Sequence, residues 1–284
     1  MENKQDDENS VNIKESILLS ELSDDPNDYD QNNYDQNNYD QNNYDQNNYD
    51  QNVYDQNGYD PNDYDDEQRK KKKVIIILEG ACLQLIEVKR FIYELANSRK
   101  HKNILKKNKV DEENIKNFRP DILHQCLIHL LESPLNKFGY LQIYIKTHDN
   151  QLFYVSSNLK IPKTFQQFES LMVTFLRKYK IKANEKNIYL LKIIKNDLQN
   201  ILPINGHKIG LSLKGKKVEL NNYIKVYKNT NQPVTFFIGA VAYSNPTMKL
   251  QILDDNISIS DFSLSAAMCC SSICSEFEHL WNLF

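Results

Sequence analysis

A five-residue repeat separates this chain into a part that cannot fold and a part that can. Tyrosine recurs at every fifth position from 29 to 64, each time followed by aspartate and mostly spaced by glutamine and asparagine. A period of five matches neither the 3.6-residue turn of a helix nor the two-residue repeat of a strand. Residues 24–68 have almost no aliphatic side chains, so they cannot bury enough apolar surface to offset a backbone entropy cost of about 1–2 kcal/mol per residue. We therefore predict a disordered tail.

Charge divides the chain at the same place. Residues 1–68 contain 20 Asp and Glu against 2 Lys, a net charge of −18, whereas the remaining 216 residues contain 18 acidic and 33 basic residues, a net charge of +15. Such a tail could compete with nucleic acid for the basic part or drive self-association, but neutral expansion of one copied unit is the interpretation we prefer. The basic run at 69–73 fits a nuclear-import or phosphate-contacting patch and equally a solvated domain edge.

Composition and motifs exclude several classes of protein. The longest purely aliphatic run, at 74–78, has five residues, where a membrane span needs about 20. The five cysteines and the absence of a leading apolar segment predict a reduced, intracellular protein without a disulfide framework. We find no Walker loop, nucleophile elbow, dinucleotide fingerprint or metal motif, and Cys269, Cys270 and Cys274 fit an apolar helix pattern.

Residues 74–284 are predicted to form one α/β domain, because segments of strand and helix character alternate. The unbroken apolar run at 74–78 is typical of a central strand covered on both faces. Further strands are expected at 141–147 and 152–156 (a hairpin), 188–194, 208–213 and 234–239. Helices are expected at 83–97, from Pro120 to about 133, at 164–180 and at 264–284, the last with Phe277 and Trp281 as core anchors. The positive charge of this domain favours nucleic-acid binding, with a lysine-rich codon bias as the alternative.

Six segments carry a more specific signal, and they occur in order at 77–81, 119–125, 133–136, 161–165, 191–196 and 258–267. In sequence and spacing they resemble the small-subunit rRNA pseudouridine N(1)-methyltransferase family of ribosome biogenesis (the nucleolar essential, or essential for mitotic growth, proteins). The resemblance implies a SPOUT-type α/β fold whose C-terminal third is threaded into a trefoil knot, an exception to the unknotted rule. It also implies S-adenosylmethionine (S-adenosyl-L-methionine) as cofactor and no metal.

The resemblance places the cofactor on loops that act largely through main-chain groups. The residues implied are Ile209, Gly210, Leu211, Gly239, Ser244, Asp261, Phe262, Ser263, Leu264, Ser265 and Ala266. The family commonly has a glycine where this chain has Ser244, so a positive φ at that position would cost energy here.

The resemblance assigns catalysis to Arg119 and Asp121. Arg119 would contact the substrate nucleotide, and Asp121 would fix its guanidinium by a charge-assisted hydrogen bond. Without the resemblance, an acidic residue in the first turn of a helix explains the pair as well. The RNA-binding arginines of the family correspond to Lys160, Lys163 and Gln167, so two positions keep a positive charge and one loses it.

The function implied is methylation of ring nitrogen 1 of a pseudouridine in small-subunit (18S) rRNA. The expected setting is the nucleus and nucleolus, with the chain as a homodimer among pre-ribosomal assembly factors. The alternative is a non-catalytic RNA-binding assembly factor of the same fold, for which Ser244 and Gln167 are the only support.

Overall fold

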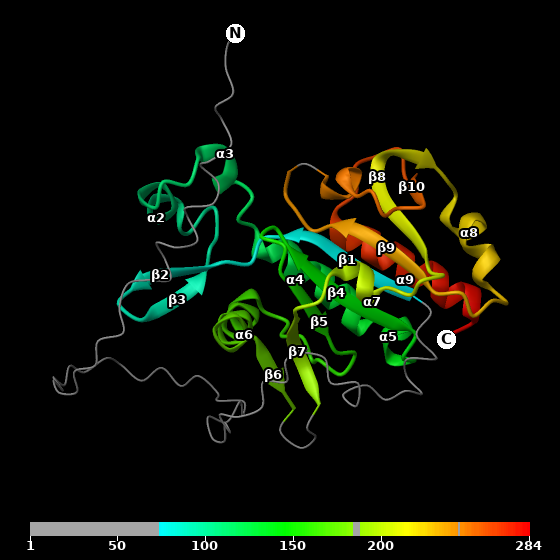
Figure 1. Ribbon diagram of the computed structural model, residues 1–284, viewed down its shortest axis with the longest axis horizontal. Coiled ribbons are helices and arrows are strands. Elements are labelled where there is room, and N and C mark those ends of the chain that lie inside the picture. Colours follow the sequence, from blue (N-terminus) through cyan, green and yellow to red (C-terminus); the bar gives the residue numbers. More distant parts are fainter. Residues whose placement is uncertain (1–73, 184–187, 244) are drawn as a thin grey trace, which may run out of the picture. The chain divides into compact units, whose positions relative to one another are not determined.

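The computed structural model describes residues 74–183, 188–243 and 245–284. The expected tail and basic run, residues 1–73, lie outside the described residues. The core is a sheet of eight strands in the order β10-β8-β9-β1-β4-β5-β7-β6 (Figure 1). The strands are β1 (Val74–Ala81), β4 (Leu141–Thr147), β5 (Leu152–Val155), β6 (Lys180–Lys182), β7 (Tyr189–Ile194), β8 (His207–Lys217), β9 (Val234–Gly239) and β10 (Asp255–Ser258).

Strand direction divides this sheet into two parts. The run β10-β8-β9-β1-β4 is parallel, and β5, β7 and β6 continue it in antiparallel pairing. The expected α/β class with a mostly parallel sheet is therefore confirmed. The expected hairpin is also present as β4 and β5, whose turn contains Asn150 at a φ of 61°.

Strand β1 lies at the centre of the parallel part, as its apolar run predicts. Its side chains alternate between two cores: Val74, Ile76 and Leu78 belong to the larger core and Ile75 and Ile77 to the smaller one. All five are buried. A strand with one face exposed to solvent would have polar residues at every second position, whereas β1 is apolar and buried on both faces.

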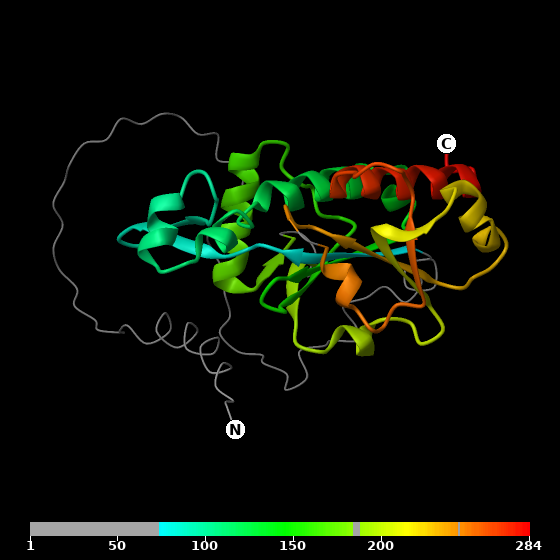
Figure 2. The same ribbon diagram turned by 90° about the horizontal axis from the view of Figure 1, so that it is seen from above.

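Helices cover the larger core on one face of the sheet. They are α4 (Pro120–Glu132), α6 (Phe165–Lys178) and α9 (Ala266–Trp281), and α4 packs directly against α9 (Figures 1 and 2). The opposite face carries α7 (Leu198–Ile201) and the apolar side chains of Leu250, Ile252 and Leu253. The expected helices at 120–133, 164–180 and 264–284 are confirmed, with ends shifted by a few residues.

The expected helix at 83–97 is wrong. The segment forms an antiparallel hairpin of β2 (Leu85–Lys89) and β3 (Ile92–Leu95), joined by Arg90 and Phe91. Its apolar residues are spaced by three or four, which fits a helix. In the structure, however, Ile86 and Leu95 are buried in two different hydrophobic clusters, with Leu95 in the larger core. Contact of β3 with α6 decides the conformation, since short apolar patterns do not discriminate between helix and strand.

Several short elements had no periodic signal in the sequence, because each is no more than six residues long. They are α2 (Lys102–Lys107), α3 (Glu112–Ile115), α5 (Pro134–Lys137), α8 (Leu220–Tyr223), η2 (Ile224–Tyr227) and η3 (Pro246–Lys249). None of the described helices is both long enough and apolar enough to span a membrane.

Candidate active site

Arg119 and Asp121 form a clamp at the start of α4. Arg119 is the residue before the first helical turn, Pro120 is the first helical residue, and Asp121 follows in that turn. The guanidinium donates from Nε to Asp121 Oδ1 at 2.8 Å and from Nη2 to Oδ2 at 2.6 Å. This fork-to-fork geometry fixes the plane of the guanidinium. No hydrogen bond to its Nη1 group is formed within the described part of the chain, so that edge remains available to a ligand.

The clamp keeps both groups charged. Hydrogen bonding to Asp121 raises the pKa of Arg119 against the opposing effect of burial. Partial burial would raise the pKa of Asp121, but the hydrogen bonds and charge of Arg119 outweigh burial and hold it below its ordinary value. Both side chains are about one-third exposed, so the pair is reachable from solvent and carries a permanent positive charge on Arg119.

The clamp lies at the carboxyl edge of the parallel strands, where ligands bind in open α/β sheets. Helix α4 runs back from the end of β1 toward the start of β4, so its first turn sits at that edge. Tyr243, in the loop after β9, lies close enough to Arg119 to contribute to the raised pKa of the guanidinium. The ammonium of Lys116 lies 4.9 Å from the centre of the same Tyr243 ring. The structure thus brings the predicted catalytic pair to the predicted cofactor loop.

Two of the predicted cofactor segments leave main-chain groups unpaired. In the loop after β9, Val241, Ala242 and Tyr243 make no main-chain hydrogen bond to the described residues, and neither do Ser263 and Leu264 before α9. Ser265 caps α9 by accepting from Met268 N. These loops fit a ligand held through main-chain groups. Ser244 lies outside the described residues.

The third predicted segment, 209–211, is engaged within the protein. Ile209 is fully buried, and the carbonyl of Leu211 accepts from Thr247 Oγ1 at 3.0 Å and from Asn245 Nδ2 at 3.3 Å. A Cβ on Gly210 would lie 2.5 Å from Leu253 Cδ1. Gly210 therefore makes room for Leu253, and this segment supports the loop after β9 from beneath.

The start of α9 carries three more of the predicted cofactor residues. Ala266 is the first residue of the helix, and Asp261 and Phe262 lie in the loop before it. The carboxylate of Asp261 pairs with Lys217 at the end of β8, and Phe262 N donates to Ser260 Oγ at 3.0 Å. The Phe262 ring is 79% exposed. Gly239, at the end of β9, lies against Pro246, whose Cδ would be 3.0 Å from a Cβ at that position.

The predicted RNA-binding residues lie beside α4. His124 in α4 bonds the carbonyl of Pro162 at 2.7 Å and stacks on Phe168, which holds the start of α6 against α4. Lys160 and Lys163 are exposed there, and Lys163 pairs with Glu132 at the end of α4. Gln167 is exposed too, but its Oε1 accepts from Thr164 Oγ1 at 3.1 Å. Gln167 N in turn donates to Thr164 Oγ1, so Gln167 takes part in the cap that Thr164 forms at the start of α6.

Glu79 is a buried charge at this edge that the sequence analysis did not single out. It ends the apolar run of β1, pairs in register with Gly239 and Lys146, and is 4% exposed. Burial raises its pKa above the ordinary value, although Lys146, with Nζ 3.5 Å from Oε1, acts in the opposite direction. The signal that could have found it is a carboxylate directly after five apolar strand residues.

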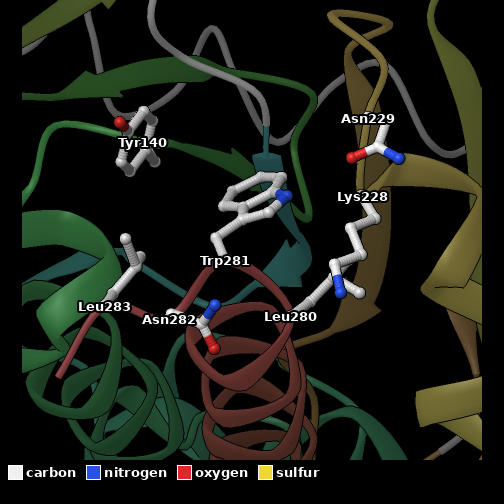
Figure 3. Close-up of a pocket in the computed structure, with 7 residues that line it drawn as sticks. All are labelled: Tyr140, Lys228, Asn229, Leu280, Trp281, Asn282 and Leu283. Carbon is white, nitrogen blue, oxygen red and sulfur yellow. The ribbon is translucent and has the colours of Figure 1, made fainter.

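One cavity lies away from the predicted cofactor loops, and a second borders the loop before α9. The first, of about 280 Å³, is lined by Trp281, Tyr140 and neighbouring residues at the end of α9 (Figure 3). The second, of about 440 Å³, lies between α8 and α9, and Leu264 is the one predicted cofactor residue on its wall. Among the described residues, no three His, Cys, Asp or Glu side chains gather as a metal site.

Comparison with known proteins identifies the family. The profile described as EMG1/NEP1 methyltransferase matches residues 76–278. This chain belongs to the EMG1/NEP1 methyltransferase family. It is 37% identical over 218 residues to the ribosomal RNA small subunit methyltransferase NEP1 of Drosophila melanogaster, covering 75% of this chain and 84% of that protein. The protein of the same name from Mus musculus is 38% identical over 212 residues, covering 75% and 83%.

The fold agrees with this membership of the EMG1/NEP1 family. The crystal structure of Archaeoglobus fulgidus Nep1 bound to S-adenosylhomocysteine superposes with a TM-score of 0.60, at 22% identity, over 74% of this chain and 98% of that one. The family match runs from β1 to near the end of α9. It therefore includes the clamp, the predicted cofactor segments and the start of α6.

Proposed function

We propose that this EMG1/NEP1 family member is an S-adenosylmethionine-dependent methyltransferase. Its substrate would be ring nitrogen 1 of a pseudouridine in small-subunit (18S) rRNA. The observation that carries the proposal is the Arg119–Asp121 clamp at the carboxyl edge of the sheet, next to Tyr243 of the loop after β9. Curated relatives over most of the chain are named as small-subunit rRNA methyltransferases.

The chain has two tasks in this chemistry. The bound cofactor supplies the methyl group from a sulfonium by in-line displacement, so the protein must hold the two reactants in line. Nitrogen 1 gives up its proton to solvent before it accepts the methyl group, so negative charge develops on the ring. Arg119 stabilises that charge through its Nη1 edge without changing its own protonation, while Asp121 keeps the guanidinium plane oriented.

We assign the cofactor to the loop after β9 and the loop before α9. Their unpaired main-chain groups at 241–243 and 263–264 suit adenine, ribose and carboxylate recognition. Gly239, Ser244, Asp261, Phe262, Ser265 and Ala266 complete this assignment. Ile209, Gly210 and Leu211 would act from beneath, by holding Asn245 and Thr247 in place.

We also propose that the C-terminal third is threaded as a trefoil knot. Supporting this, the chain leaves β9, places η3 against Leu211, and returns as β10 on the far side of β8. Strand β10 then pairs with both halves of β8, with a shift in register between Asn256 and Ile257. Such a crossing is what a threaded connection requires.

The RNA is proposed to lie across the start of α4 and α6. Arg119, Lys160, Lys163 and Gln167 border this surface, and Lys163 would exchange Glu132 for a phosphate. The chain would act in the nucleus and nucleolus as a homodimer, together with pre-ribosomal assembly factors. The residues at 1–73 would form a disordered tail next to the 74–284 methyltransferase domain.

Methyl transfer to a short RNA hairpin containing pseudouridine tests this proposal. We expect transfer to that hairpin and none to the same hairpin with uridine, whose nitrogen 1 is bonded to ribose. Transfer to neither, in protein that binds S-adenosylmethionine by calorimetry, would contradict the substrate assignment. Absence of cofactor binding would instead favour the non-catalytic RNA-binding assembly factor.

A further inference from the structure

A helical insert between the β2–β3 hairpin and α4 borders the clamp. Residues 97–118 contain α2 and α3, and they pack around a small hydrophobic cluster of their own, apart from the larger core. Ser98 N donates to the carbonyl of Phe118 at 2.8 Å. This bond joins the two ends of the insert. The backbones of Arg99 and Arg119, each one residue further along the chain, therefore lie close together.

Two cations of the insert lie at the clamp without an ion-pair partner. Arg99 and Lys116 are exposed, and among the described residues no carboxylate is within ion-pair distance of either. Burial tends to raise the pKa of Asp121, Arg119 holds it down, and the charge of Arg99 adds a smaller effect in the same direction. The one negative charge of Asp121 is thus shared by two guanidinium groups. The surroundings of the clamp keep a net positive charge, which is complementary to phosphate.

Tyr243 adds an exposed aromatic ring beside these cations. The Lys116 ammonium lies 4.9 Å from the ring centre, and the side chain is 54% exposed. Asp121 chiefly raises the pKa of Arg119, and Tyr243 contributes to that shift, so the ring is close to the guanidinium as well. An ammonium over a solvated ring is held weakly. A phosphate can therefore draw Lys116 away and leave the ring face to a base.

We propose that Tyr243 is the stacking platform for the target base and that Lys116 and Arg99 hold phosphates next to its nucleotide. The inference rests on the proposed function. Bases stack favourably on aromatic side chains, and enzymes that modify a base take it out of its stack into a pocket with such groups. On Tyr243 the pyrimidine ring lies near the free Nη1 edge of Arg119 and beside the loop assigned to the cofactor.

A structural explanation competes with this one for Lys116. Its ammonium over Tyr243 would fasten the loop after β9 to the insert and so help to shape the cofactor site. Under that explanation, Lys116→Gln weakens S-adenosylmethionine binding and leaves RNA affinity at saturating cofactor unchanged. Under the proposal, Lys116→Gln keeps the cofactor affinity and lowers the RNA affinity. The structural explanation also gives no role to Arg99.

The test of Tyr243 compares a short hairpin that contains the target pseudouridine with the same hairpin carrying an abasic site there. Both are bound to the full-length chain saturated with S-adenosylhomocysteine, which has no methyl group to transfer. We expect the pseudouridine hairpin to bind at least about fivefold more tightly, the smaller effect of one stacked base. Tyr243→Ala is expected to lose most of this difference. Tyr243→Phe and Tyr243→Trp keep it, because stacking needs the ring and not the hydroxyl.

Lys116→Gln and Arg99→Gln test the phosphate contacts. Each is expected to lower the slope of log affinity against log salt by about 0.7 for the pseudouridine hairpin, for one lost single-strand contact. Cofactor affinity by calorimetry and the melting temperature are expected to match the unchanged chain. Weaker cofactor binding by Lys116→Gln with an unchanged salt slope would overturn the role of Lys116 and leave it as a fastener of the loop.

Two matched controls lie at the opposite edge of the sheet, just before β4. Phe138→Ala removes a ring that is 56% exposed, and Lys137→Gln removes an exposed lysine; both are expected to bind the two hairpins as the unchanged chain does. Equal affinity of the unchanged chain for the two hairpins, or an undiminished difference in Tyr243→Ala, would overturn the inference. Unchanged salt slopes in both cation variants would overturn its phosphate contacts. Absence of methyl transfer alongside the expected binding differences concerns the proposed function alone.

Discussion

At the scale of single residues, Arg119 and Asp121 act as one unit. We expect Arg119→Ala to lower turnover about a hundredfold or more, as when a donor to a developing anion is removed. Asp121→Ala should lower turnover and also the free energy of unfolding, by about 0.3–1 kcal/mol from the lost charge in the first helical turn. Because both changes remove the same clamp, their effects on turnover in the double variant should not add.

The prediction is checked by measuring turnover of the two single variants and of the double variant. Binding of S-adenosylmethionine is the control for folding. If the pair is only a helix start, Arg119→Ala keeps near-normal turnover and Asp121→Ala lowers only the melting temperature. Arg119→Lys is a useful third variant. It retains the charge but cannot form the two-point contact with Asp121, so we expect it to resemble Arg119→Ala in turnover.

Gly210 tests whether a predicted cofactor residue acts through packing. A Cβ at this position would meet the side chain of Leu253 at 2.5 Å, so Gly210→Ala should lower the free energy of unfolding by about 1–3 kcal/mol through overpacking. If Gly210 acts through packing alone, adding Leu253→Ala should recover part of the lost free energy of unfolding and part of any cofactor affinity lost with it. Urea unfolding measures the first quantity and calorimetry the second. Cofactor affinity that stays low in a stable double variant would mean that Gly210 approaches the cofactor directly.

The raised pKa of Glu79 leads us to predict that the free energy of unfolding depends on pH. Its pKa is raised in the folded chain by burial, so the folded state holds the proton more tightly than the unfolded state. The free energy of unfolding therefore falls as pH rises from the ordinary glutamate pKa to the higher folded-state pKa, and then levels off. Glu79→Gln should remove this fall. Urea unfolding of both proteins from pH 4 to 8 gives the difference, and a parallel pair of curves would contradict the prediction.

At the scale of elements, the start of α6 combines a structural and a binding role. Thr164 accepts from Gln167 N, and its hydroxyl donates to Gln167 Oε1. We expect Thr164→Ala to lower the free energy of unfolding by about 0.5–2 kcal/mol, whereas Thr164→Ser keeps the cap. Thermal unfolding measures both changes. Equal stability of the alanine and serine variants would show that the cap contributes nothing.

At the scale of the whole molecule, the tail and the domain are predicted to be independent. Deleting residues 1–68 should leave the melting temperature and methyl transfer to a short RNA unchanged, because a repeat without apolar faces has no core contacts to lose. A large drop in melting temperature would contradict this. A rise in non-specific RNA affinity after deletion would instead support competition by the net charge of −18.

The sequence by itself determined the elements that local patterns encode. The unbroken apolar run of β1, the apolar stripes of α4 and α6, and the β4–β5 hairpin all follow from side-chain periodicity and turn residues, and the structure confirms them. Six ordered segments were enough to indicate the family, which the comparisons confirm. The roles of the individual site residues and of the tail stay predictions.

Only the tertiary structure decided what depends on residues far apart in the chain. The segment at 83–97 fits a helix by spacing, and contact of β3 with α6 makes it a hairpin. The carbonyl of Leu211 is taken by Thr247, and Tyr243 comes close to Arg119 across more than a hundred positions. Such contacts arise from packing of the sheet and its connections, and no local periodicity carries them.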